Sequence, residues 1–361
     1  MKKIKDLFKI LFFIMNTQLA FSQVDVVYND LVWSDEFDTN GAINSTKWHH
    51  QTQLPNGGSW FNGEVQHYTN QQTNSSVNNG FLNIVAKKET FTDQNVTKQY
   101  TSARLNSKFA FLYGRVDIRA KVPTNQGTWP ALWMLGKNVN EDGGFFDAVY
   151  GNTSWPQCGE IDILEHGITP SQPTNYIQSA LHTPSSFGNT MNIGGTIVNN
   201  LGSDFHIYSI NWSPNEISFL LDGVIYYTYN PSVKNSNNWP FNAEQYLLLN
   251  IAMGGIAGTI PSNFTQTSME VDYVRVYQNS LFVPNQNQLN QISFQNPVQD
   301  YLIIDSDINI DQVQIYNLLG NLVFKTKSNT KTIDVKNLSK GIYLVVFYSN
   351  TIRSVKKIIV N

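Results

Sequence analysis

The stretch GRVDIRAKV at residues 114–122 alternates apolar and charged side chains without a break. On an extended chain Val116, Ile118 and Ala120 share one face, and the charged residues between them share the other. A period of two with one apolar face is typical of a half-buried antiparallel strand. This stretch therefore predicts a sheet with one face on a hydrophobic core.

Similar short runs recur through residues 24–281, and convincing helical periodicity is almost absent. The clearest are LNIVA (82–86), FHIYSINW (205–212), EISFLL (216–221) and MEVDYVRVY (269–277). Turn pairs separate them, among them Asn79-Gly80 and Asp222-Gly223, which suit hairpins because they tolerate positive φ. About a dozen such strands without interposed helices predict an all-β fold, a large two-sheet sandwich.

The composition changes near residue 282. All eight tryptophans lie between Trp33 and Trp239, and all six histidines between His49 and His206. Residues 282–290 are polar and proline-bearing, as in a linker. Beyond them, short apolar runs at 301–304, 312–316, 322–324, 332–335 and 341–347 predict a small C-terminal β-sandwich over residues 291–361. We therefore expect two domains, at 23–281 and 291–361.

The first 22 residues predict a signal peptide. Lys2, Lys3 and Lys5 form a positive start, an unbroken apolar run follows at 10–15, and Ala20-Phe21-Ser22 offers small residues for cleavage. The alternative is a buried helix at the start of the fold. No other stretch approaches membrane-spanning length, so we expect no membrane span and an exported protein, secreted or at the cell surface.

The composition excludes several classes of function. Charged residues make up 14% of the chain and the net charge is -3, which argues against nucleic acid as a partner. Cys158 is the single cysteine, so the chain has no internal disulfide and no cysteine-based metal site. Abundant neutral polar residues instead suit a hydroxyl-rich ligand.

Three carboxyl groups fall within six residues of the segment QCGEIDILEH, at 157–166. On a regular strand Glu160 and Asp162 share a face, whereas Glu165 would point into the core, where an unpaired carboxylate costs several kcal/mol. One extra residue near Ile163–Leu164, a β-bulge, returns Glu165 to the face of the other two. The sequence thus predicts three aligned carboxyls on one bulged strand.

Aligned carboxyls raise one another's pKa, so a protonated acid and an ionised nucleophile can coexist near neutral pH. Retaining glycoside hydrolysis needs two carboxyls about 5–5.5 Å apart. Glu160 and Glu165, leaning toward each other across Asp162, are candidates for that pair. A solvated acidic strand face or a cation site is the alternative.

The segment GEIDILEHG resembles the active strand of glycoside hydrolase family 16, in the bulged variant of laminarinases. The resemblance continues in family order through LVWSDEFD, STKWHH, NGEVQHYT, NNGFLNIVAKKE, YTSARLNSKFAFLYGRVDIRAKVP, GTWPALWMLG, SALHTP, NWSPNEISFLLDG, LLLNIAMGG and MEVDYVRVYQ, over nearly all of residues 31–278. It implies a β-jelly-roll (concanavalin-like) sandwich with an open cleft that hydrolyses β-glucans or galactans with retention, as a monomer and without a cofactor for catalysis.

The resemblance also assigns roles residue by residue. Glu160 corresponds to the nucleophile and Glu165 to the general acid/base, while Asp162 would hydrogen-bond Glu160 and tune its ionisation. The matching sugar-binding positions are Asn62, Glu64, Arg104, Trp129, Trp133, Trp155 and His182. Core packing is the alternative for each tryptophan, and a cross-strand ion pair with an acid such as Asp117 is the alternative for Arg104.

Two further expectations concern the surroundings of the cleft. Many family members hold a structural calcium far from it, and backbone oxygens near Glu36 and at Gly80, with Asp272, occupy the matching positions. The long segment 137–155 lies where a loop would partly wall the cleft and favour an end-on or branched substrate.

Residues 291–361 resemble the C-terminal sorting domain of the Bacteroidetes type IX secretion system, through NPVQDYLII, VQIYNLLGNLV, IDVKNLSKGIYLVVF and RSVKKIIVN. This implies the type IX machinery as a partner, with export across the outer membrane and removal of the tail. A carbohydrate-binding module is the rival interpretation, but the tail has no tryptophan to stack on sugars.

Three functional hypotheses result. The first, which we adopt, is endo-hydrolysis of β-1,3-glucan, with some tolerance for mixed β-1,3/1,4-glucan. The second keeps the fold and mechanism but takes an algal galactan, and the net acidic character of residues 23–281 argues weakly against a sulfated one. The third is a non-catalytic glycan-binding protein on the same sandwich, which would have no need of the three carboxyls.

Overall fold

The computed structural model describes residues 24–55, 58–279, 292–306, 310–317, 321–327, 331–349 and 352–361. The predicted signal peptide and linker lie outside these residues. By its contacts the chain divides between Asn279 and Ser280 into two compact units, and each is described by itself. No helix within the described residues is long and apolar enough to cross a membrane.

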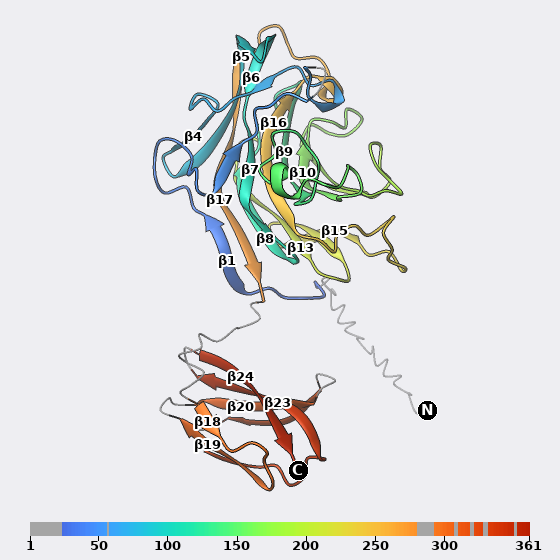
Figure 1. Cartoon of the computed structure of the whole chain (residues 1–361). Helices are drawn as coiled ribbons and strands as arrows, with labels where there is room; N and C mark the ends of the chain where they lie inside the picture. Colours follow the sequence, from blue (N-terminus) through green and yellow to red (C-terminus); the bar gives the residue numbers. More distant parts are fainter. Residues whose placement is uncertain are drawn as a thin grey trace, which may run out of the picture. The chain divides into compact units, whose positions relative to one another are not determined.

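The larger unit is a sandwich of two sheets (Figure 1), as the alternating runs predict, and its strands pair antiparallel except for the parallel pair of β3 and β6. In pairing order, the seven-stranded sheet contains β12 (Ile193–Ile197), β11 (Tyr176–His182), β10 (Glu160–His166), β9 (Thr128–Gly136), β16 (Gln245–Met253), β7 (Arg104–Phe111) and β2 (Trp48–His50).

The ten-stranded sheet forms the other layer. Its pairing order is β15 (Val224–Tyr229), β14 (Ile217–Leu221), β13 (His206–Trp212), β8 (Gly114–Lys121), β17 (Gln266–Gln278), β5 (Phe81–Asp93), β6 (Val96–Ser102) and β3 (His67–Tyr68). Two further strands join it: β1 (Asp30–Asp35) pairs with β17, and β4 (Ser75–Asn78) pairs with β5. The helical pieces are the short α1 (Asp147–Tyr150), η1 (Phe61–Gly63) and η2 (Gly255–Ala257).

Strand β8 has the buried face and the exposed face that its alternating sequence predicts. Val116, Ile118 and Ala120 of β8 are fully buried between the sheets, and the charged residues between them are partly exposed. The two-residue turn Asp222-Gly223 joins β14 to β15, and both its residues have positive φ. The pair Asn79-Gly80 does the same between β4 and β5. Both features follow from residue type alone.

One face of the seven-stranded sheet packs into the main core and leaves the other free for a site. On β9, Leu132 and Met134 are fully buried in that core, whereas Trp129, Ala131 and Trp133 point to the opposite side. On β16, Leu249 and Ile251 face the core, and Asn250 and Ala252 face away. The period of two thus separates packing residues from site residues on each strand.

The smaller unit is also all-β, with its own buried core. One sheet contains β18 (Ile292–Phe294), β19 (Tyr301–Ser306) and β22 (Thr332–Asp334). The other contains β21 (Leu322–Lys327), β20 (Gln312–Asn317), β23 (Gly341–Ser349) and β24 (Ile352–Val360). The small C-terminal sandwich is therefore confirmed.

Candidate active site

The predicted β-bulge is present in β10. Asp162 pairs with Ala180 of β11, and the next pair is Glu165 with Gln178, so β10 holds one extra residue between them. The register against β9 shifts at the same place. Ile163 and Leu164 both pack into the core, at most 1% exposed. The bulge therefore keeps the apolar side chains inside and returns Glu165 to the carboxyl face.

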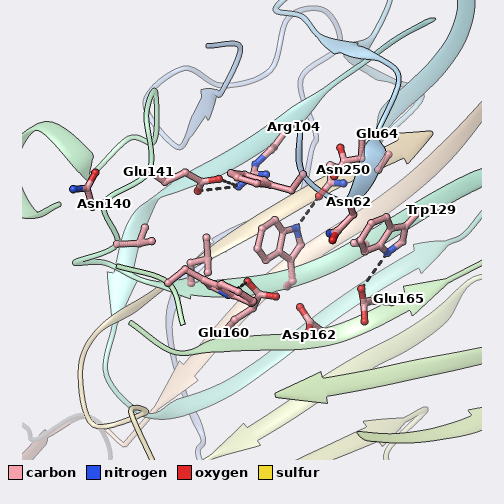
Figure 2. A pocket seen from close by; sticks show the side chains of 17 residues that line it. Asn62, Glu64, Arg104, Trp129, Asn140, Glu141, Glu160, Asp162, Glu165 and Asn250 are labelled. Carbon is pink, nitrogen blue, oxygen red and sulfur yellow. Dashed lines mark hydrogen bonds and ion pairs between the residues drawn. The ribbon is translucent and has the colours of Figure 1, made fainter. Parts of the chain in front are cut away.

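Glu160, Asp162 and Glu165 line one cleft of about 380 Å³ on the free face of the seven-stranded sheet. Figure 2 shows them in a row along one strand, with Glu141 and Arg104 across the cleft. Nine of the ten predicted catalytic and sugar-binding residues line it: Glu160, Asp162, Glu165, Asn62, Glu64, Arg104, Trp129, Trp133 and Trp155. His182 is the exception.

Each glutamate of the predicted pair accepts a hydrogen bond from a tryptophan indole. Trp155 Nε1 donates to Glu160 Oε2 at 3.0 Å, and Trp129 Nε1 donates to Glu165 Oε1 at 3.1 Å. Trp155 is 40% exposed, so core packing is excluded for it. Each bond orients one carboxyl group through one of its two oxygens. The second oxygen of each carboxyl takes no part in the bond to the indole.

Burial raises the pKa of all three carboxyls. It raises the pKa of Glu165 to about 8, and the neighbouring Asp162 adds to this. Burial also raises the pKa of Asp162 to about 8. For Glu160, burial and then the charge of Asp162 raise the pKa, while His182 opposes them. The three groups therefore share fewer than three negative charges at neutral pH, which is what a proton-donating acid beside a nucleophile requires.

The pH dependence of activity follows from the Glu165 pKa. An acid with a pKa of about 8 is protonated below that pH and loses its proton above it. We expect kcat/KM to fall tenfold per pH unit above about pH 8. Initial rates between pH 4 and 10 check this. A flat profile up to pH 9.5 would contradict Glu165 as the acid.

Trp129→Phe provides a finer check, because the Trp129 hydrogen bond lowers the pKa of Glu165 against the effect of burial. Phenylalanine keeps an aromatic ring at position 129 but cannot donate the hydrogen bond that stabilises the ionised form of Glu165. We expect the alkaline limb to move to higher pH by roughly half a unit to one unit. The pH–rate profile measures it, and a limb that moves to lower pH would show that the bond acts otherwise.

The same pKa shift affects stability. A carboxyl whose pKa rises from 4.5 to about 8 on folding binds its proton more tightly in the folded state. Its contribution to stability is full below about pH 4.5 and is lost as the pH rises through 8. Glu165→Gln should therefore match the wild type near pH 4.5 and exceed it at pH 8 by roughly 4 kcal/mol. Thermal unfolding at both pH values tests this, and equal gains would contradict it.

A buried hydrogen-bond chain holds the polar wall opposite the carboxyls. Trp133 Nε1 donates to Asn250 Oδ1 at 2.7 Å, and Asn250 Nδ2 donates to Tyr68 Oη at 3.1 Å. Tyr68 in turn donates to Glu64 Oε2 at 3.0 Å, which also accepts a bond from Gln66. This chain orients Trp133 and Glu64 before any ligand arrives.

Arg104 forms its ion pair inside the cleft. Its Nη2 lies 2.7 Å from Glu141 Oε1, and its guanidinium lies over the rings of Trp133 and Trp60. The alternative partner Asp117 is wrong, because Asp117 pairs with Arg115 on its own strand. Arg104 is 3% exposed, so the pair is nearly dry. It ties segment 137–155 to the cleft floor.

Segment 137–155 walls the cleft, as its position predicts. Val139, Asn140, Glu141 and Trp155 all line it. The segment is fixed by further bonds: Gln51 Nε2 donates to the Asp142 carbonyl, and the Phe145 amide donates to Asn106 Oδ1.

His182 lies beside the carboxyls, outside the set of cleft-lining residues. Its Nε2 is 3.2 Å from Asp162 Oδ2 and 3.5 Å from Glu160 Oε1. The role predicted for it, holding a sugar hydroxyl, stays a prediction. Cross-strand register brings it here, because His182 pairs with Glu160 on the adjacent strand and its ring lies beside the nucleophile.

One of the predicted calcium ligands, the Asp272 side chain, is already paired with a cation. Asp272 pairs with Arg119, and Glu36 forms a two-point ion pair with Arg275. Asp272 is the one side-chain carboxylate of the predicted set, since Glu36 and Gly80 were to offer backbone oxygens. In this arrangement the donor set does not fit a divalent cation without displacement of Arg119. Calcium binding stays a prediction.

Three site residues escaped sequence reasoning: Glu141, Asn250 and Tyr68. Asn250 gave a signal, because it is the one polar residue in the apolar run YLLLNIAM at 246–253. Glu141 gave none, because its partner Arg104 lies 37 residues away along the chain. Tyr68 bonds to Glu64 four residues away, but its link to Asn250 spans 182 residues.

Comparison with known proteins gives the family. The sequence profile of the glycosyl hydrolases family 16 matches residues 62–275. This chain belongs to glycosyl hydrolase family 16. Residues 294–361 match the secretion system C-terminal sorting domain, so the resemblance of the tail is confirmed. The jelly-roll sandwich predicted for the larger unit is confirmed as well.

Several family 16 members are similar over most of the catalytic region. A beta-glucanase of Rhodothermus marinus is 37% identical over 266 residues, covering 69% of this chain and 85% of that protein. A keratan-sulfate endo-1,4-beta-galactosidase of Sphingobacterium multivorum is 32% identical, covering 70% of this chain and 56% of that protein. The crystal structure of a LamA variant from Z. galactanivorans with laminaritriose and laminaritetraose is 48% identical, with a TM-score of 0.64, covering 70% of this chain and all of that one.

Proposed function

We propose that this family 16 chain hydrolyses laminarin-type β-1,3-glucan within its chains and with retention of configuration, and that it also accepts mixed β-1,3/1,4-glucan. The observation that carries the proposal is the bulged strand β10, which presents Glu160 and Glu165 to one cleft, each oriented by an indole N–H. Its relatives include a beta-glucanase and a structure with bound laminari-oligosaccharides.

The first half of the reaction uses both glutamates. The ionised Glu160 attacks the anomeric carbon while Glu165 gives its proton to the departing glycosidic oxygen. The bond between the anomeric carbon and that oxygen breaks, and a glycosyl ester with Glu160 forms. The raised pKa of Glu165 keeps the proton available at neutral pH, and Trp155 Nε1 aims the carboxylate of Glu160.

In the second half Glu165, now ionised, takes a proton from a water molecule that attacks the same carbon. The ester breaks, Glu160 regains its charge and Glu165 regains its proton. Two displacements on one carbon restore the β configuration. Trp129 Nε1 supports Glu165 while it carries the charge.

The charge of the cleft favours a neutral sugar polymer. Among the cleft-lining residues that the structure describes, Arg104 is the one cation, and Glu141 already neutralises it. A sulfated galactan would need cations free to meet its sulfate groups. The lining instead offers aromatic rings, asparagines and carboxyls, which suit neutral hydroxyl-bearing chains.

A parallel assay tests the substrate class. The purified protein is incubated with laminarin, lichenan, agarose and κ-carrageenan, and released reducing ends and product lengths are measured. We expect short oligosaccharides from laminarin, slower release from lichenan and none from the galactans. Release from the galactans alone would keep the carboxyl roles and overturn the substrate. Binding of laminarin without any release would favour a glycan-binding protein.

We further propose that residues 1–22 are a signal peptide, that the sorting domain at 294–361 directs type IX export with loss of the tail, and that the protein is a monomer. The matched sorting domain supports the export route. Terminal sequencing and the mass of the secreted protein test both cleavages, and light scattering after size exclusion tests the monomer.

A further inference from the structure

His182 is positioned between two of the three carboxyls. It ends β11 and pairs in register with Glu160. One oxygen each of Glu160 and Asp162 and the Nε2 of His182 all lie within 4.8 Å of one another. The His182 side chain is 12% exposed and packs against the Trp155 ring, with centroids 5.6 Å apart. Its ring therefore lies beside the nucleophile and against Trp155.

A backbone amide determines which ring nitrogen of His182 carries the proton. The N–H of Gly188 donates to His182 Nδ1 at 3.1 Å. A ring nitrogen that accepts a hydrogen bond carries no proton, so the neutral ring has its single proton on Nε2. A second proton on Nδ1 would set two N–H groups against each other. Gly188 follows the turn that the Thr183–Ser186 pairing closes. The hydrogen bond from Gly188 to Nδ1 therefore comes from the backbone next to a closed turn.

Glu160 and Asp162 each present an oxygen that can accept a hydrogen bond from Nε2 of His182. Asp162 is 3% exposed, and its Oδ2 has no hydrogen-bond partner among the described residues. Glu160 receives Trp155 on Oε2, and its Oε1 faces His182. One N–H thus faces two acceptors, with Nε2 at 3.2 Å from one and 3.5 Å from the other, and it is aligned fully with neither.

We propose that His182 is a positioning residue that carries a proton on Nε2 and shares it between Glu160 and Asp162. This inference rests on the proposed retaining mechanism. When Glu160 is ionised the N–H supports it. When Glu160 becomes the glycosyl ester, its charge is gone and the N–H turns to Asp162. His182 neither gives a proton to the substrate nor takes one from it.

A neutral ring suits this position better than a cation. An imidazolium beside Glu160 would stabilise the free carboxylate and weaken it as a nucleophile. The other ionisable groups that act on Glu160 are Asp162 and Glu165 on β10 and Glu141 from segment 137–155. All of these are acidic, and the Gly188 N–H occupies the Nδ1 lone pair of His182.

Two variants of the full chain test the role through kinetics. His182→Gln keeps an N–H donor near the position of Nε2, and His182→Leu removes it. We expect His182→Gln to retain kcat within about tenfold and His182→Leu to lose roughly 10²–10³-fold in kcat, with KM nearly unchanged. In His182→Leu the acid limb of the kcat/KM profile should move to higher pH, because Glu160 loses a donor to its charged form. Equal losses in both variants, or a loss carried by KM, would overturn the proposal.

A measurement on the wild type keeps the test independent of folding and of substrate. The ¹⁵N shifts of the histidine rings, assigned by comparison with His182→Gln, report the tautomer directly. We expect the neutral ring to carry its proton on Nε2, with Nδ1 as the acceptor of the Gly188 N–H. An Nδ1–H tautomer would overturn the proposal even if laminarin is hydrolysed. If laminarin is not hydrolysed but the tautomer is as expected, the proposed function fails and the geometry of His182 stands.

Discussion

Glu160→Gln should lower laminarin turnover by at least about 10⁴-fold while leaving fold and glucan binding intact. The amide is nearly isosteric with the carboxyl and still accepts the Trp155 N–H at 3.0 Å, but it cannot attack the anomeric carbon. Because burial raises the pKa of Glu160, loss of its charge should not destabilise the protein. Rates on laminarin, thermal unfolding and oligosaccharide titration measure the three effects.

The matched control is Glu270→Gln on β17, in the ten-stranded sheet, where Glu270 pairs with Lys121. It makes the same chemical change in the other sheet, away from the cleft, so kcat should stay within about twofold of the wild type. The fold should also be kept, because partly exposed ion pairs contribute only about 0–1 kcal/mol to stability. Substantial turnover by Glu160→Gln, after exclusion of deamidation by mass spectrometry, would remove Glu160 as the nucleophile.

Glu165→Ala should be nearly inactive on laminarin, with a loss of roughly 10²–10⁴-fold, because a sugar leaving group must be protonated. On an aryl β-glycoside with a good leaving group, the first step needs no acid and the glycosyl ester accumulates. Azide, which needs no general base, should then attack the ester and restore turnover. The product should be the β-glycosyl azide, after two inversions at one carbon.

Glu160→Ala is the control for the azide experiment. It lacks the nucleophile, so azide entering the vacated space should give the α-glycosyl azide after a single inversion. If Glu165→Ala gave the α product and Glu160→Ala the β product, the two roles would be exchanged. Proton NMR of the isolated azides separates these outcomes.

The fold and the three-carboxyl strand could be predicted because each depends on a local pattern. Alternation in residues 114–122 separates a buried face from a charged one, and positive φ at Asp222-Gly223 follows from residue type. The bulge at Ile163–Leu164 could be predicted because a regular strand would bury an unpaired Glu165 in the core. In the structure the extra residue lies between Asp162 and Glu165, which keeps the Glu165 carboxyl out of the core.

The contacts that complete the site could not be predicted in this way. The ion pair of Arg104 with Glu141 joins a strand to a loop 37 residues away, and nothing in either segment selects the partner. The chain from Trp133 through Asn250 and Tyr68 to Glu64 depends on three segments meeting on one sheet face. His182 was assigned to the sugar from its motif, whereas cross-strand register decides that it faces the carboxyls.

The most direct test of the central claim is real-time proton NMR of laminarin hydrolysis by the full chain, recorded before the products mutarotate. If Glu160 and Glu165 act as a retaining pair, the β-anomeric signal of new reducing ends appears first and the α signal follows as it equilibrates. If the α signal appears first, a single inversion has occurred, and the double displacement through Glu160 is contradicted.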